Sequence, residues 1–341
     1  MNATRLIIFC IVALPALVAA ADAGLDPHIR AVLTRFLKFG AVELADMERG
    51  KAVKHTIATS TPGEIAVAGA VRVNVPKATL LERVRDIVHF KQGPEILQIG
   101  RFSNPPAIDD LAALTVEPGD FDAQSCRVAD CDTRLPADVI RRAEREVDGT
   151  APDARARSSN LFKQILLDHV KAYVSGSPGR FEQYDDGAKP IRPMDEFAGV
   201  VKNTPSLEAL VPGLPGHLLD FPAHRVAGAD DFLYWSKEKF GVAPFISVTQ
   251  VTIVCPAPPT CVVATKDVYS SRYVDASLSL TIASDVAGSP TAFYLVYANR
   301  SRATALKGRF SALRRSIAER RTRGGVEDTL KTLKIRLETG R

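Results

Sequence analysis

Apolar and polar residues alternate along two parts of the chain, as they do in half-buried β-strands. Between residues 64 and 75 the apolar side chains fall on one face of an extended backbone and the polar ones on the other. Four β-rich runs follow in the last third, over residues 245–254, 262–270, 271–283 and 292–298, joined by turn-prone segments. This order predicts one early strand and a later antiparallel meander.

Helical periodicity occupies the regions around these strands. Residues 26–39 and the segment after Pro76 carry apolar side chains at intervals of three and four. The longest periodic run covers residues 306–337, and the glycine pair at 324–325 predicts a kink or a division into two helices there. Between about residues 100 and 240 the pattern is irregular, which predicts shorter helices separated by loops.

Two segments carry the clearest strand and helix patterns near the two ends of the predicted domain. VAGAVRVNVPKATLLERVRDI (67–87) is a strand leading into a helix, and VEDTLKTLKIRLE (326–338) ends the last helix. With the meander between them, they resemble the START-like, helix-grip family. The resemblance implies an α+β fold, in which a curved antiparallel sheet is packed on a long C-terminal helix around an apolar cavity, with helical and loop insertions. It also implies a domain over 64–341 with a large insertion at about 100–240, preceded by an N-terminal helical segment at 22–63.

The first residues have the pattern of a cleavable secretory signal peptide. Arg5 precedes an apolar run from Leu6 to Val18, and small residues follow, with cleavage predicted near Ala21. The apolar run is shorter than the roughly 20 residues that a membrane-spanning helix needs. A retained anchor is the alternative, but no basic cluster follows the run. Residues 1–21 are therefore predicted to be a signal peptide, and the mature protein to be soluble and periplasmic or secreted.

After the predicted signal peptide the chain has four cysteines, and they form two close pairs. Cys126 and Cys131 lie in CRVADC, and Cys255 and Cys261 lie in CPAPPTC. Zinc binding is the alternative to disulfides, but the spacing is longer than in a common zinc knuckle and no histidine lies close by in sequence. Two local disulfides are the favoured interpretation, and they agree with export from the cytosol.

Positive charge is concentrated at the C-terminus. The chain has a formal net charge of +5, and the segment from residue 302 to 341 holds twelve Lys and Arg against four Asp and Glu. Arg314, Arg315, Arg320 and Arg321 could contact an anionic membrane surface, although a solvated helix face is the alternative explanation. Nucleic-acid binding is not expected, because no stacking aromatic residues accompany the basic ones.

Common catalytic motifs are absent from the sequence. There is no nucleophile elbow, no zinc-binding helix motif, no phosphate-binding glycine loop and no dinucleotide fingerprint. A binding protein is therefore favoured over an enzyme, with no cofactor or metal expected. His217, Asp220 and His224 are close together in GHLLDFPAHR, and the sequence leaves open whether they form a site or ordinary loop hydrogen bonds. Asp267, Asp275 and Asp285 of the meander could likewise be ligands, but strand-face and turn aspartates commonly meet solvent.

Aromatic residues concentrate in the β-rich part of the chain, where a helix-grip cavity would lie. Such rings suit a pocket with apolar walls and a few polar groups, although each ring could equally belong to the core. The predicted ligand-binding residues are Tyr234, Trp235, Tyr269, Tyr273, Tyr294 and Tyr297. The predicted function is to bind a hydrophobic small molecule or lipid in an apolar cavity. The alternative is a non-enzymatic interaction or structural protein of the cell envelope, docking through its sheet and basic C-terminal helix.

Overall fold

The computed structural model describes residues 24–177, 181–240, 243–307 and 311–340. For residues 240 and 311–323 it describes the backbone only. The predicted signal peptide, residues 1–21, lies outside this range. Among the described residues, no helix combines the length and the apolar character needed to cross a membrane.

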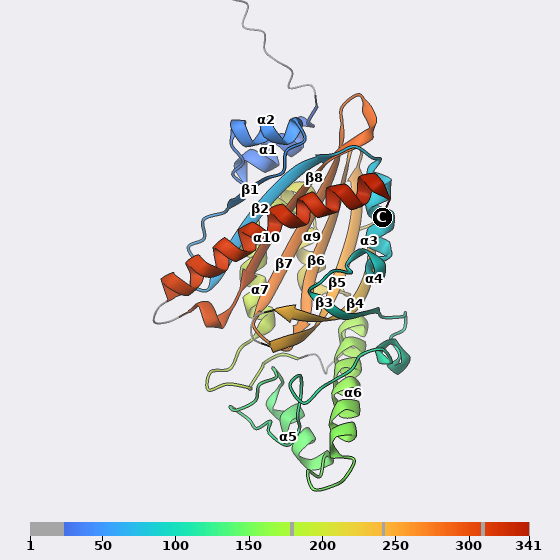
Figure 1. Ribbon diagram of the computed structural model, residues 1–341, viewed down its shortest axis with the longest axis vertical. Helices are drawn as coiled ribbons and strands as arrows, with labels where there is room; N and C mark the ends of the chain where they lie inside the picture. The colour runs from blue at the N-terminus through green and yellow to red at the C-terminus, as the bar shows by residue number, and fades with distance from the viewer. Residues whose placement is uncertain (1–23, 178–180, 241–242, 308–310, 341) are drawn as a thin grey trace, which may run out of the picture.

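Eight antiparallel strands form one sheet with helices on both faces (Figure 1). Across the sheet their order is β1-β2-β8-β7-β6-β5-β4-β3. The strands are β1 (Val53–Thr56), β2 (Glu64–Val73), β3 (Ile96–Arg101), β4 (Asp230–Phe240), β5 (Ala243–Ala257), β6 (Thr260–Ser270), β7 (Ala276–Val286) and β8 (Ser289–Arg302). The chain is therefore α+β with an antiparallel sheet, which confirms this part of the predicted fold.

The helices lie before, between and after the strands. They are α1 (Pro27–Arg35), α2 (Ala41–Glu48), α3 (Lys77–Arg85), α4 (Ile87–Phe90), α5 (Ala137–Glu146), α6 (Ala154–Ser175), α7 (Pro193–Lys202), α8 (Ser206–Leu210), α9 (Leu214–Asp220) and α10 (Ser311–Thr339), with 3-10 turns η1 (Ile108–Leu111) and η2 (Thr304–Leu306). One helix, α10, runs through Gly324 and Gly325, so the predicted division into two helices is wrong.

The two faces of the sheet pack against different helices. Val71 and Leu295 share a core with Leu330 of α10, and we call this side of the sheet the α10 face. Leu280 shares a core with Phe197 of α7, and we call the opposite side the α7 face. Figure 1 shows α10 in front of the sheet, with α7 and α9 behind it. Successive residues of a strand point to opposite faces, so alternate residues of each strand belong to different cores.

The long connection between β3 and β4 is folded into helices. Helices α7, α8 and α9 join α1 and α2 on the α7 face, where their apolar side chains form one core with the sheet. Helices α5 and α6 form another core with the loops around them and with Trp235 and Tyr269 of the sheet. Figure 1 shows α5 and α6 below the end of the sheet. The insertion therefore buries side chains that the sheet alone would leave exposed.

Both predicted disulfides are present. Cys126 is bonded to Cys131 in the loop before α5, and Cys255 is bonded to Cys261 across the turn between β5 and β6. Each bond closes a short loop, so each restricts the unfolded chain modestly, by about 2 kcal/mol in the loop-entropy model. The local cysteine spacing was sufficient to predict both pairings.

A glycine allows α10 to lie close to β2. A Cβ atom at Gly69 would be 2.6 Å from Cγ1 of Val326 and 2.7 Å from Cδ1 of Leu330. These separations are shorter than packed carbon atoms tolerate. The missing side chain therefore sets how closely this part of the helix approaches the strand.

We predict that Gly69→Val lowers the free energy of unfolding by about 1–3 kcal/mol, because the added side chain overpacks the contact with α10. Urea unfolding followed by circular dichroism measures this change. Gly93→Val is the control, since a Cβ atom at position 93 would meet no atom within 4 Å. Equal losses in both variants would contradict the prediction.

Candidate functional site

The α10 face of the sheet is apolar toward one end of its strands and polar toward the other. At the apolar end Phe293, Val251 and Val263 are buried beside Leu80 and Leu81 of α3. At the other end, seven polar side chains of β6, β7 and β8 remain partly exposed, and we call them the polar patch. They are Thr265, Asp267, Ser277, Ser279, Thr281, Tyr297 and Asn299.

Local sequence explains why these side chains share a face. In β7 the run ASLSLTI alternates small polar and large apolar residues, and Leu278, Leu280 and Ile282 are buried on the α7 face. Antiparallel pairing then aligns Ser279 with Asn299 and with Thr265. Residues opposite one another in a sheet point to the same side, so the polar positions of three strands form one surface.

Hydrogen bonds connect several members of the polar patch. The hydroxyls of Ser279 and Tyr297 are 3.1 Å apart. Nδ2 of Asn299 donates to the hydroxyls of Ser277 and Ser279, at 3.2 and 3.0 Å. Burial raises the pKa of Tyr297 above its usual value, and the negative charge of Asp267 acts in the same direction. The Tyr297 hydroxyl therefore stays protonated and able to donate a hydrogen bond at neutral pH.

Asp267 is the carboxylate of the patch, and it lies on β6 in the middle of the sheet. The Thr249 hydroxyl donates to its Oδ1 at 3.1 Å, and among the described residues this is its only side-chain hydrogen bond. Burial raises the pKa of Asp267 to about 6, although the charge of Lys91 opposes the rise. A carboxylate that titrates near neutral pH can accept a hydrogen bond, pair with a cation or exchange a proton.

Lys91 follows α4 and supplies a cation beside the patch. Its Nζ atom bonds to Oε1 of Glu238 and lies 5.1 Å from the ring centre of Tyr234. The Ser236 hydroxyl donates to the same Glu238 carboxylate at 2.7 Å. Although burial lowers it, Tyr234 and Glu238 raise the pKa of Lys91 above its usual value. Lys91 is therefore a charged group with a carboxylate partner of its own.

The structure brings together two of the six predicted ligand-binding residues. Tyr234 and Tyr297 lie on the α10 face, and the charge of Lys91 reaches both rings. Trp235 and Tyr269 belong instead to the core formed with α5 and α6, where the Trp235 indole donates to the Asp110 carbonyl at 2.8 Å. These two side chains are enclosed by protein on the opposite side of the sheet.

The remaining two predicted residues also lie away from the patch. Tyr294 is buried on the α7 face, in the core that contains α1 and α2. Tyr273 lies in the loop before β7, where its hydroxyl donates to the Ala243 carbonyl and accepts from the Ala243 N–H. Sequence reasoning selected aromatic rings, considered Asp267 as a ligand but favoured solvent exposure for it, and did not consider Lys91. The available signal for Asp267 was a carboxylate inside a β-rich run, although the charged Lys266 lies beside it.

His217 belongs to a buried structural network. Its Nδ1 accepts from the Val226 N–H at 3.1 Å, so its proton is on Nε2, which donates to Oδ1 of Asp231 at 2.9 Å. Although burial raises it, hydrogen bonds from His217, Thr252 and Gln250 hold the pKa of Asp231 below its usual value. Both ring nitrogens are occupied, so His217 has no free atom for proton transfer.

Asp220 and His224 do not complete a site with His217. The His217 side chain pairs with Asp231 of β4, whereas Asp220 contributes its backbone carbonyl to the His224 N–H. Across the described ranges, no group of three or more His, Cys, Asp or Glu side chains is arranged to hold a metal ion. The described contacts of these residues are therefore hydrogen bonds of the core and of the loop.

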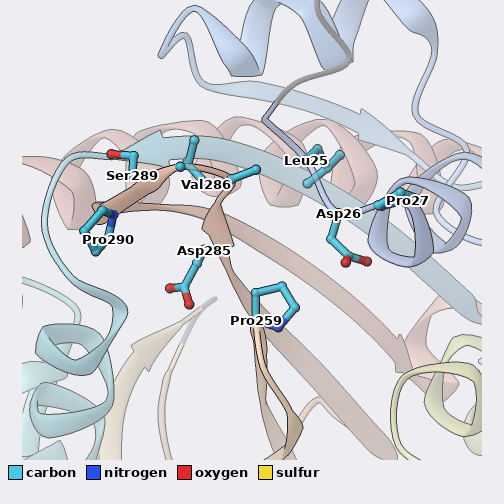
Figure 2. Close-up of a pocket in the computed structure, with 10 residues that line it drawn as sticks. Leu25, Asp26, Pro27, Pro259, Asp285, Val286, Ser289 and Pro290 are labelled. Atoms are coloured by element: carbon cyan, nitrogen blue, oxygen red, sulfur yellow. The ribbon is translucent and has the colours of Figure 1, made fainter.

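An open hollow of about 690 Å³ lies at the ends of two hairpins. Figure 2 shows its lining residues, which include Leu25, Pro259 and Val286. Its two carboxylates already have partners. Asp26 accepts from the first N–H groups of α1, and Asp285 is 2.7 Å from the Lys77 ammonium. The hollow therefore offers apolar surface, and both of its carboxylates already have hydrogen-bond or ion-pair partners.

A second hollow of about 540 Å³ lies on the α7 face, between α6, α7 and β6. Lys266 is buried at its base, 4.6 Å from the ring centre of Phe197 and 5.2 Å from that of Tyr173. Its ammonium donates to the Leu218 carbonyl at 2.7 Å. That carbonyl is in the last turn of α9, where helix carbonyls need outside donors. The contact gives Lys266 a structural role.

Searches of family models, curated proteins and solved structures gave no match to this chain. The site is consequently defined by its own geometry. The predicted membrane-contacting residues Arg314, Arg315, Arg320 and Arg321 lie in α10, but their side chains are outside the described residues.

We predict that Asp267→Asn stabilises the ligand-free protein above pH 6. The folded state binds this proton more tightly than the unfolded state does, so the wild type loses stability as pH rises from about 4 toward 6. The amide variant avoids this loss, and its advantage shrinks as the pH falls toward 4. Urea unfolding at pH 4.5 and 7.5 measures the difference, with exposed Asp109→Asn as the control. A variant less stable than wild type at pH 7.5 would contradict the prediction.

We predict the opposite effect for Asp231→Ala. This change removes the acceptor of the buried His217, so the free energy of unfolding should fall by about 3–5 kcal/mol. Asp230→Ala is the control, because Asp230 pairs with Arg85 at the surface and such pairs contribute less than about 1 kcal/mol. Thermal unfolding of both variants at pH 7 compares them, and equal losses would refute the structural role.

Proposed function

We propose that this protein binds a hydrophobic small molecule or lipid that carries one polar group, on the α10 face of its sheet. The observation that carries the proposal is the polar patch, which stays partly exposed on a face whose other half is buried. Ligand sites combine apolar surface with a few placed polar groups, and titratable residues with shifted pKa values concentrate there.

Partly exposed apolar side chains of the α10 face would supply the other half of such a site. Phe90, Ile99 and Leu333 are partly exposed and pack against the apolar core of the α10 face. Ile99 is aligned with Ser236 of β4, beside Lys91 and Glu238. The apolar part of the ligand would contact these side chains, and its polar group would contact the patch. Binding of this kind requires no covalent step.

The helix-grip resemblance supports the same location. β2 pairs with the last strand, β8, and is followed directly by α3 and α4. The described part of α10 then lies along β2, with Lys334 donating to the Arg72 carbonyl and Glu338 accepting from the Asn74 N–H. In a helix-grip protein, a curved sheet and its last helix enclose the ligand between them, and we place the ligand of this protein there.

Export is part of the proposal. The predicted signal peptide and the two disulfides agree with a periplasmic or secreted protein. Such a protein would carry its ligand through water between membranes or between cells. The envelope-docking alternative has less support, because the large exposed apolar residues among the described ones come from separate segments. They are Val42, Leu97, Ile108, Val128 and Ile335.

We predict that an apolar molecule co-purifies with the protein taken from its own envelope fraction. Native mass spectrometry, followed by solvent extraction, detects it. Thr281→Phe should lower its occupancy at least about tenfold, because Thr281 is aligned with Val263 and Tyr297, and the ring fills the border between the polar patch and the apolar core. Thr34→Phe, on an exposed position of α1, is the control.

Both variants should retain the wild-type melting temperature, so that a lost ligand cannot be attributed to unfolding. If no apolar molecule accompanies the wild-type protein, or if both variants retain it equally, the proposal is wrong. A protein partner recovered in place of a ligand would favour the docking alternative.

A further inference from the structure

We infer that the polar group of the ligand is a positively charged amine that binds to Asp267. This inference rests on the proposed function and specifies its ligand class. Asp267 is on a central strand of the sheet, its side chain is partly exposed on the α10 face, and among the described residues Thr249 is the one side chain that donates to it. A carboxylate taken out of bulk water is costly to leave with so few donors.

The nearby cation does not meet this need. The Lys91 ammonium bonds to Glu238, which accepts a further hydrogen bond from Ser236. The charge of Lys91 acts on Asp267 from a distance and is partly offset by Glu238, so Asp267 has no ion-pair partner of its own among the described groups of the face. The described titratable groups that interact electrostatically with Asp267 or Tyr297 are Lys91, Glu238, Tyr234 and Tyr184, the last on the opposite side of the sheet. A ligand cation would supply the missing positive charge.

The surrounding side chains suit an ammonium group. Asp267 and Tyr297 are close enough for the carboxylate charge to raise the pKa of the phenol. An ammonium group can donate to a carboxylate, donate to hydroxyls and lie against the face of an aromatic ring. Serine and threonine hydroxyls of the polar patch provide further acceptors. An anionic head group would instead meet two carboxylates, Asp267 and Glu238, and a neutral alcohol would leave the Asp267 charge unpaired.

Three probes with the same alkyl chain separate these possibilities. Octylamine, octanol and octanoate are titrated into the delipidated, full mature chain by isothermal calorimetry at pH 7.5. Octylamine should bind about 10- to 100-fold more tightly than octanol, as expected for a charge-assisted contact, and octanoate should bind most weakly. Asp267→Asn should remove this preference and leave octanol affinity within about threefold. Asp109→Asn is the exposed control and should change nothing.

The pH dependence is a second readout. The titrations are repeated at pH values above and below the pKa of Asp267. Octylamine stays protonated over this range, because alkyl amines titrate near pH 10. Its affinity should therefore fall about tenfold per unit as the pH drops below the pKa of Asp267, and Asp267→Asn should abolish this dependence.

Two negative results have different meanings. If octylamine and octanol bind equally at the Thr281-sensitive site, the amine inference is wrong and the proposed function stands. If none of the three probes binds and no apolar molecule co-purifies, the proposed function is wrong as well.

Discussion

The pairing of β2 with β8 is the constraint on which the rest of the structure depends. It joins residues more than 200 positions apart, in an unbroken register from Glu64 opposite Arg302 to Val73 opposite Phe293. Glu64 is fully buried at one end, where it bonds to Arg300 and Arg302 of β8 and accepts from Asn203 of the insertion. A shift of one residue would reverse every side chain and separate this carboxylate from its donors, so the buried contacts specify the register.

That register determines which side chains can form a site. Because Val71 and Leu295 are aligned, the apolar end of the α10 face continues from β2 into β8. Tyr297 and Asn299 follow two and four residues later on the same side, so β8 passes from apolar to polar along its length. Gly69 is opposite Tyr297, and its missing side chain leaves room for α10. The strand pairing therefore sets both the position of the helix and the start of the polar patch.

Local patterns were sufficient to predict some of this structure. The alternation in β2 and β7 predicted strands because a half-buried strand has a two-residue period, and short cysteine spacing predicted the two disulfides. The aromatic residues could not be assigned to faces so simply. Tyr234 and Trp235 are neighbours and necessarily point to opposite sides, and an irregularity at Val248 and Thr249 changes the alignment of β6 beyond Asp267. Helices of the insertion then enclose Trp235, through contacts that no local pattern contains.

Two aspartates of the sheet differ in their hydrogen-bond donors and in the direction of their pKa shifts. Asp231 receives hydrogen bonds from His217, Thr252 and Gln250 and pairs with Arg225, and its pKa is lowered. Asp267, on the opposite face, has one hydroxyl donor and a raised pKa. The first carboxylate stabilises the folded chain when ionised, whereas the second destabilises it. A half-buried acid that lowers stability at neutral pH and has a single hydroxyl donor is the observation from which we propose a ligand on the α10 face.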